Sequence, residues 1–363
     1  MIRTQARCRI SLPFHGLLVL SLLLVLPSCA TISSKFEKFQ APVKVTKKKA
    51  HKAKTTRIAK RRKPAKVDIP KTAARIAKRS RPAKAGPTPT CGTPDRGFGI
   101  YHPWVDNLKM GRMLLPKRGA LTANNGFDLV IHFHGGNAVR KHIVDTVRGV
   151  FVVGVGLGAG SAAYERPFRQ PKVFASLLDE IEQAVADYTG NKQAHIRRLA
   201  LTGWSAGYGA IRAILRQKAS RQVDAVVLLD GLHSNYAKVK PKVLHAGQLR
   251  PFVRFAKRAA KGEKYMFVSH SSIVPPGYAS TTETAHYLAK KLGVGIRRSV
   301  ARDTPYLSRY EQAKIGSFLM QGYHGEDKGD HCAQVALITT AVAALEKRWK
   351  TPLAKGRSYI RPK

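Results

Sequence analysis

The segment Leu199–Ala213 constrains the fold more than any other part of this sequence. The apolar run Leu199–Leu201 predicts a short buried strand, and apolar residues at helical spacing follow from residue 210. Between them, Gly203–Gly207 reads Gly-Trp-Ser-Ala-Gly and matches the G-x-S-x-G pattern. A tight strand-to-helix turn exposes the Ser205 hydroxyl beside a helix N-terminus, which favours developing negative charge. Ser205 is therefore the candidate nucleophile, and a plain glycine-rich turn is the alternative.

Strands alternate with helices along the remainder of residues 97–350. Residues 97–118 predict an opening strand pair with turns. Buried strands are predicted at 127–134, 150–155, 199–201, 223–229, 264–269 and 315–320, and helices at 173–188, 249–261, 282–292 and 332–349. This alternation predicts an α/β fold, with a mostly parallel central sheet of about eight strands covered by helices on both faces.

Polar motifs follow three of these strands. His132–Gly136 reads His-Phe-His-Gly-Gly, Asp230 ends the strand at 223–229, and Gly329-Asp330-His331 follows the last strand. In their order along the chain, His132–Gly136, Gly203–Gly207 and Gly329–His331 resemble the α/β-hydrolase superfamily over roughly residues 97–350.

The resemblance implies a role for each matching residue. His331 would be the general base, and the backbone N–H groups of Ala206 and Gly136 would form the oxyanion hole. His134 and Gly135 would support the oxyanion loop. Oxyanion donors of this kind are typically worth about 3–4 kcal/mol each.

The carboxylate partner of the base is less well defined by the sequence. In the common family arrangement it would follow the strand at 264–269, but the chain there reads His270-Ser271-Ser272 and offers no carboxylate. Asp230, one strand earlier, is the preferred candidate, with Glu283 and Asp303 as alternatives. Asp330 is interpreted as a loop residue.

Two further patterns have competing interpretations. His132 and His134 could form half of a metal site with Asp230 or His233, although support of the oxyanion loop explains His134 better. Gly154, Gly156, Gly158 and Gly160 resemble a dinucleotide-binding loop, but their spacing is not G-x-G-x-x-G. That segment is predicted to be a flexible loop at the rim of the site, and neither a cofactor nor a metal is expected.

The chain is strongly basic, with 65 Lys and Arg against 21 Asp and Glu and a net charge of +44. Residues 30–90 alone carry 20 Lys and Arg against two acids, and the segment beginning at Arg57 recurs at Arg75. A Lys/Ala/Pro-rich segment buries too little apolar surface to fold, so residues 29–90 are predicted to be a disordered basic linker. Its partner is expected to be an anionic envelope polymer, if it is more than a charged spacer. Specific nucleic-acid binding is not favoured, because aromatic residues for base stacking are lacking.

The N-terminus has the pattern of a targeting segment. Three arginines precede the apolar run 17–26, which is short for a membrane span. Leu26-Pro27-Ser28-Cys29 resembles a bacterial lipobox, with Pro27 as a departure from the usual small residue. The resemblance implies a signal peptide over 1–28, lipidation of Cys29 and tethering in the bacterial cell envelope, on the periplasmic side of the outer membrane or at the cell surface. An ordinary cleaved signal peptide is the alternative.

Residues 91–363 are then the folded domain, and two thiols remain after lipidation of Cys29. Cys91 begins the domain and Cys332 follows the candidate base, so a Cys91–Cys332 disulfide is predicted outside the reducing cytoplasm. Two unpaired thiols are the alternative.

These observations favour a lipid-anchored serine hydrolase that cleaves an ester or amide through an acyl-enzyme. A hydrolase-fold lipoprotein without activity, binding envelope polymers through its basic arm, is the competing hypothesis.

Overall fold

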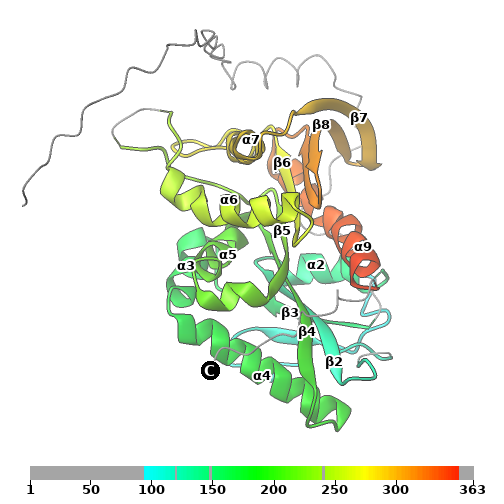
Figure 1. Ribbon diagram of the computed structural model, residues 1–363. Helices are drawn as coiled ribbons and strands as arrows, with labels where there is room; N and C mark the ends of the chain where they lie inside the picture. The colour runs from blue at the N-terminus through cyan, green and yellow to red at the C-terminus, as the bar shows by residue number, and fades with distance from the viewer. Residues whose placement is uncertain (1–93, 119–120, 147–148, 239–241, 351–363) are drawn as a thin grey trace, which may run out of the picture. The chain divides into compact units, whose positions relative to one another are not determined.

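Apolar segments from the middle of the chain pair into one large sheet in the computed structural model, which describes residues 94–118, 121–146, 149–238 and 242–350 (Figure 1). Within these residues the sheet has nine strands in the order β1-β3-β2-β4-β5-β6-β9-β8-β7. The strands are β1 (Arg112–Leu114), β2 (Gly126–Phe133), β3 (Val150–Val155), β4 (His195–Trp204), β5 (Val223–Leu229), β6 (Tyr265–Ser271), β7 (Arg297–Thr304), β8 (Leu307–Ile315) and β9 (Phe318–Tyr323).

The six strands from β3 to β9 in the middle of the sheet run parallel, whereas β1, β7 and β8 pair antiparallel at its two ends. The chain passes from β2 to β3 on one side and then returns to place β4 on the other side of β2. In open parallel sheets, ligands bind outside the carboxyl ends of the strands at such a reversal. The ends of β2 and β4 are therefore the expected place for a site.

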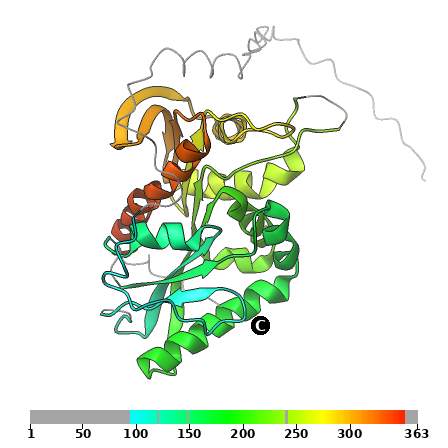
Figure 2. The same cartoon turned by 180° about the vertical axis from the view of Figure 1, so that it is seen from behind.

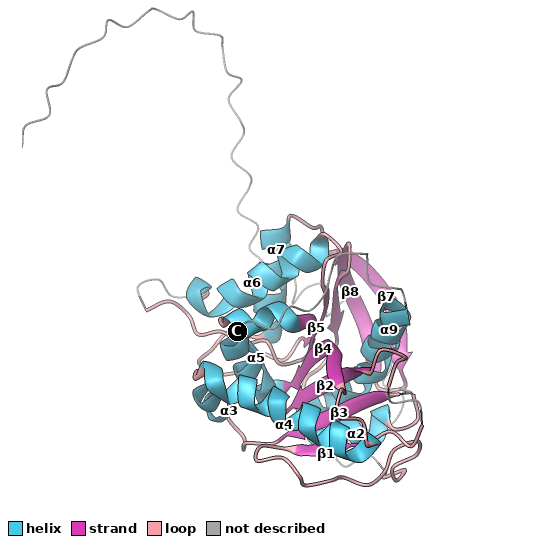
Figure 3. Cartoon of the chain, turned by 60° about the horizontal axis from the view of Figure 1, so that its bottom comes forward, coloured by secondary structure: helices cyan, strands magenta, loops and turns pink. Residues whose placement is uncertain are grey.

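Helices cover both faces of the sheet, because the central strands carry apolar side chains toward each face. Side chains of α3–α7 join one hydrophobic core, and those of α2 and α9 join the other. Figures 2 and 3 show α9 on the opposite side of the strands from α4 and α6. The helices are α2 (Gly136–Ile143), α3 (Ser161–Phe168), α4 (Pro171–Thr189), α5 (Tyr208–Ile214), α6 (Ala246–Ala260), α7 (Thr281–Leu292), α8 (Lys328–Ala333) and α9 (Leu337–Lys350), with short 3-10 turns η1 (Ser205–Gly207), η2 (Lys218–Gln222) and η3 (Gln334–Ala336).

The predicted α/β class is confirmed, with the mostly parallel sheet expected of an α/β-hydrolase fold. The strands predicted at 150–155 and 223–229 have the bounds of β3 and β5. The opening strand pair was predicted wrongly in part, since only Arg112–Leu114 forms a strand and the earlier residues contribute isolated bridges.

Two other predictions need correction. Strands β7 and β8 were not predicted, because β7 is rich in charged, largely exposed residues and shows no apolar run. The last helix was predicted to begin after His331. Instead, His331 lies within α8, which Asp327 caps at its N-terminus, and a second helix, α9, begins at Leu337.

The predicted signal peptide, lipidated cysteine and basic linker lie outside the described residues. No helix in the described part of the chain is both long and apolar enough to cross a membrane.

Candidate active site

Left-handed backbone conformations mark the ends of three neighbouring strands. His134 follows β2 with φ 69°, Ser205 follows β4 with φ 49°, and Asp230 follows β5 with φ 42°. Positive φ is uncommon for residues other than glycine, and such conformations cluster at functional sites. Because β2, β4 and β5 are adjacent and parallel, these turns bring the three side chains to one edge of the sheet, at the reversal of strand order.

The turn at Ser205 is packed so closely that glycine is required at two positions. A Cβ on Gly207 would lie 2.0 Å from the carbonyl oxygen of Phe133, because the turn lies directly against the end of β2. A Cβ on Gly231 would lie 2.6 Å from the carbonyl oxygen of Ser205. The residue after Asp230 therefore touches the backbone of Ser205, and the two strand ends fix each other's position.

Asp230 and His331 form a hydrogen-bonded pair. The Nδ1 atom of His331 lies 2.7 Å from Oδ2 of Asp230. The other carboxylate oxygen, Oδ1, accepts hydrogen bonds from the backbone N–H of Ser271 (2.9 Å) and the hydroxyl of Thr281 (2.6 Å). Asp230 is only 2% exposed, and three donors from β6, α7 and α8 hold its carboxylate in one orientation.

The same contacts determine the charge of the carboxylate. Burial alone would raise the pKa of Asp230, but hydrogen bonds and charge from His331, with further hydrogen bonds from Thr281 and Ser271, lower it to about 2. Asp230 is thus an anion at neutral pH and holds the Nδ1–H tautomer of His331, which leaves Nε2 free to accept a proton.

Trp204 connects His331 to the serine turn. Its ring stacks on the imidazole of His331 at 4.9 Å, and its Nε1–H donates to the carbonyl oxygen of His331 at 3.1 Å. Trp204 directly precedes Ser205 in the chain, so the histidine is held against the residue next to the candidate nucleophile.

The two predicted oxyanion donors each lie at the start of a helical segment. Gly136 is the first residue of α2, and Ala206 is the second residue of η1, which continues into α5. N–H groups in the first turn of a helix have no intrahelical acceptor, so both point outward as donors. Gly135 caps α2 with φ 78°, and a Cβ there would lie 2.7 Å from the ring of Trp204.

Two histidines of β2 and its turn hold the loop that carries Gly136. Nε2 of His132 lies 2.6 Å from the carbonyl oxygen of His134, and its Nδ1 lies 2.8 Å from the hydroxyl of Thr202. Burial lowers the pKa of His132 to about 3, so the ring is neutral and Nε2–H is the donor to that carbonyl. Nδ1 of His134 bonds to the hydroxyl of Tyr164, and its ring stacks on Trp204.

The glycine-rich segment after β3 also belongs to this network. The hydroxyl of Tyr164 accepts the N–H of Leu157 and donates to the carbonyl oxygen of Gly158, both at 3.1 Å. Tyr164 therefore ties the segment to His134 at the rim of the site.

The structure does not bring the alternative acids to His331. Glu283 accepts hydrogen bonds from Ser280 and Tyr236 in a capping box at the start of α7, and Asp303 accepts one from Tyr323. Asp330 is buried and accepts the backbone N–H of Glu326.

The histidine pair proposed as half of a metal site has other partners. His132 bonds to Thr202 and the carbonyl of His134, and Nδ1 of His233 bonds to the carbonyl oxygen of Ala279. Among the described residues, the group that could hold a metal ion lies elsewhere, at His270, His286 and Glu311.

Sequence reasoning missed several supporting residues, chiefly Trp204, Thr281, Ser271 and Tyr164. One signal was present: Ser280 and Glu283 form an S-x-x-E capping box, which locates the start of α7 and thereby Thr281. The other three contacts join segments distant in sequence and have no local signature.

Cys332 lies in α8 directly after His331 and is disulfide-bonded. Cys91, the predicted partner, lies outside the described residues.

No family model and no curated protein matches the sequence. Solved structures with a similar arrangement include an acylaminoacyl peptidase from Pyrococcus horikoshii (14% identity, TM-score 0.37, covering 66% of this chain and 41% of that one). They also include the ester hydrolase EH1AB1 from the metagenome of Lake Arreo (13% identity, TM-score 0.39, covering 78% of this chain and 98% of that one). A prolyl endopeptidase is a third (14% identity, TM-score 0.36, covering 68% of this chain and 39% of that one). The match covers less than half the length of the two peptidases. The activities named for the three proteins are stated of those proteins alone.

Proposed function

We propose that the protein is a serine hydrolase that cleaves an ester or amide through an acyl-enzyme on Ser205. The observation that carries the proposal is the strained serine turn beside a buried aspartate–histidine pair, with Trp204 contacting both. A structural serine needs neither a left-handed backbone nor a buried carboxylate–imidazole pair held against the residue beside it.

Each residue has a defined role in the proposed reaction. The Ser205 hydroxyl attacks the acyl carbonyl while Nε2 of His331 takes its proton, and Asp230 stabilises the resulting imidazolium. The N–H groups of Ala206 and Gly136 stabilise the tetrahedral oxyanion. His331 returns the proton to the leaving group, and water then hydrolyses the acyl-enzyme by the same steps.

Hydrolysis of a short p-nitrophenyl ester tests the proposal. Ser205→Ala and His331→Ala should abolish turnover, and Asp230→Asn should reduce it by roughly 10⁴-fold, because the imidazole would no longer be held in the productive tautomer. Glu283→Gln is the matched control, because Glu283 caps α7 and glutamine preserves the capping box. Turnover near wild type in Asp230→Asn, with loss in Glu283→Gln, would show that the acid is misassigned.

We propose further that Cys29 carries lipid and tethers the enzyme in a bacterial envelope, since Leu26–Cys29 resembles a lipobox. Metabolic labelling with a palmitate analogue should mark the full-length chain in a bacterial host. Label that persists in Cys29→Ser would refute the anchor without bearing on the hydrolase.

A further inference from the structure

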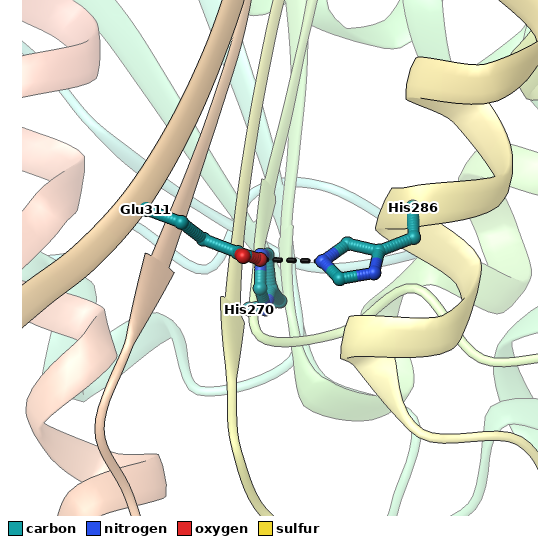
Figure 4. Close-up of side chains that lie close together, drawn as sticks. All are labelled: His270, His286 and Glu311. Atoms are coloured by element: carbon teal, nitrogen blue, oxygen red, sulfur yellow. Dashed lines mark hydrogen bonds and ion pairs between the residues drawn. The ribbon is translucent and has the colours of Figure 1, made fainter. Parts of the chain in front are cut away.

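A second polar cluster lies between helix α7 and the strands β6 and β8 that it covers. His270 belongs to β6, Glu311 to β8 and His286 to α7, and all three are buried. Figure 4 shows both imidazoles directed at the carboxylate of Glu311. The proposed hydrolytic chemistry uses none of them.

The sheet register explains why these side chains meet. Gly322 in β9 pairs with His270 on one side and with Glu311 on the other. A Cβ at Gly322 would lie 2.5 Å from Cε1 of His270 and 2.7 Å from Cγ of Glu311. Because glycine stands at this position, the two side chains reach across the middle strand toward each other, and His286 reaches the same point from the covering helix.

Both imidazoles point a nitrogen at the same oxygen. Nε2 of His286 lies 2.5 Å from Oε1 of Glu311, and Nε2 of His270 lies 3.2 Å from that atom. The three candidate ligand atoms all lie within 4.8 Å of one another. Two imidazole nitrogens and a carboxylate oxygen form a common ligand set for zinc.

The hydrogen bond of His270 to Thr282 uses Nδ1 and leaves Nε2 directed into the cluster. Thr282 donates its hydroxyl proton to the carbonyl oxygen of Ser271 at 2.6 Å, so it accepts from Nδ1–H of His270 at 3.0 Å. The other ring nitrogen, Nε2, faces Oε1 of Glu311 at 3.2 Å. Because His270 is 0% exposed, the two imidazole nitrogens and the carboxylate oxygen offer a cation three ligand atoms at one buried point.

We propose that His270, His286 and Glu311 bind one Zn²⁺ ion. Tetrahedral zinc with bonds of about 2.0–2.2 Å needs ligand atoms about 3.3 Å apart, so His270 and Glu311 already have the required spacing. His286 and Glu311 need to separate by less than about 1 Å. Thr282 fixes the tautomer of His270 as outer partners of metal-bound histidines do.

A bound ion would join the central strand β6, the antiparallel strand β8 and helix α7. Ser271, adjacent to His270, and Thr281, at the start of α7, both donate to the carboxylate of Asp230. Bound zinc would therefore hold the two donors that orient the proposed catalytic acid.

Metal content and thermal stability of the full chain test the proposal. Purified protein should retain about one zinc per chain by mass spectrometry after dialysis, and chelator-stripped protein should regain a higher Tm on addition of Zn²⁺. His286→Gln and Glu311→Gln should lose both effects. His195→Ala is the matched control, because His195 is exposed and is the first residue of β4, a strand that carries none of the three ligands.

Thr282→Val retains all three ligands, so it tests the site even if the ligand variants fail to fold. It should weaken zinc affinity by about 10–100-fold while preserving the fold. Bound Co²⁺ should give the visible absorption of a tetrahedral site in wild type and lose it in His286→Gln. If wild type and His286→Gln retain equal zinc and Zn²⁺ leaves both Tm values unchanged, the cluster is held by a proton alone and the proposal is wrong, whatever the esterase activity.

Discussion

At the scale of single residues, the site depends on Asp230 more than on any other buried group. Its backbone is left-handed, its carboxylate accepts hydrogen bonds from three elements, and its pKa is lowered to about 2 although burial alone would raise it. The free energy that holds this carboxylate ionised is therefore also free energy that stabilises the folded chain.

Stability in acid measures this contribution. The pKa of Asp230 is lower in the folded chain than the reference value near 3.9, so its contribution is present above about pH 4 and is lost as pH falls toward 2. A shift of this size corresponds to about 2–3 kcal/mol. Denaturant unfolding at pH 4.5 and pH 2.5 should show a smaller loss of stability in Asp230→Asn than in wild type. An equal loss would contradict the lowered pKa, and the exposed Asp106→Asn serves as control.

At the scale of elements, the helices, strands and turns that have a local sequence pattern could be predicted from the sequence. The apolar runs of β3 and β5, the G-x-S-x-G turn and the order of motifs along the chain all have local signatures. The charged, largely exposed β7 has none, and β8 is held in place by pairing with β9. The contact of Trp204 with His331 joins residues 127 positions apart and follows from the fold alone.

The closeness of β2 to the serine turn makes a direct prediction. Gly207→Ala places a Cβ against the backbone oxygen of Phe133, so either the turn or the strand must move. Overpacking of this kind costs typically 1–3 kcal/mol, and esterase turnover should fall as well because Ser205 shifts. Gly156→Ala is the matched control, since nothing lies within 4 Å of a Cβ there. Equal unfolding free energies for the two variants would contradict the packing described.

At the scale of the whole molecule, the sequence has a basic segment and a lipobox-like segment ahead of the folded domain, and a cysteine beside the proposed base. A bridge from Cys91 to Cys332 would tie the start of the domain to α8, which carries His331. Because the closed loop is long, such a bridge is worth up to about 5 kcal/mol in the chain-entropy model and about 2–4 kcal/mol in practice.

Non-reducing peptide mapping after alkylation tests this bridge. Protein exported in a bacterial host should yield one cross-linked peptide pair containing Cys91 and Cys332, and Cys332→Ser should lower the Tm. Alkylation of both thiols in the unreduced native chain would rule the bridge out.

The central claim is that Ser205 is an activated nucleophile, and covalent labelling measures this most directly. A fluorophosphonate probe should form one adduct per folded chain, located by mass spectrometry on the peptide that contains Ser205. The adduct should be absent in Ser205→Ala, strongly reduced in His331→Ala and unchanged in Glu283→Gln. A folded wild-type chain that gains no adduct, or a Ser205→Ala chain that labels as well as wild type, would contradict the account.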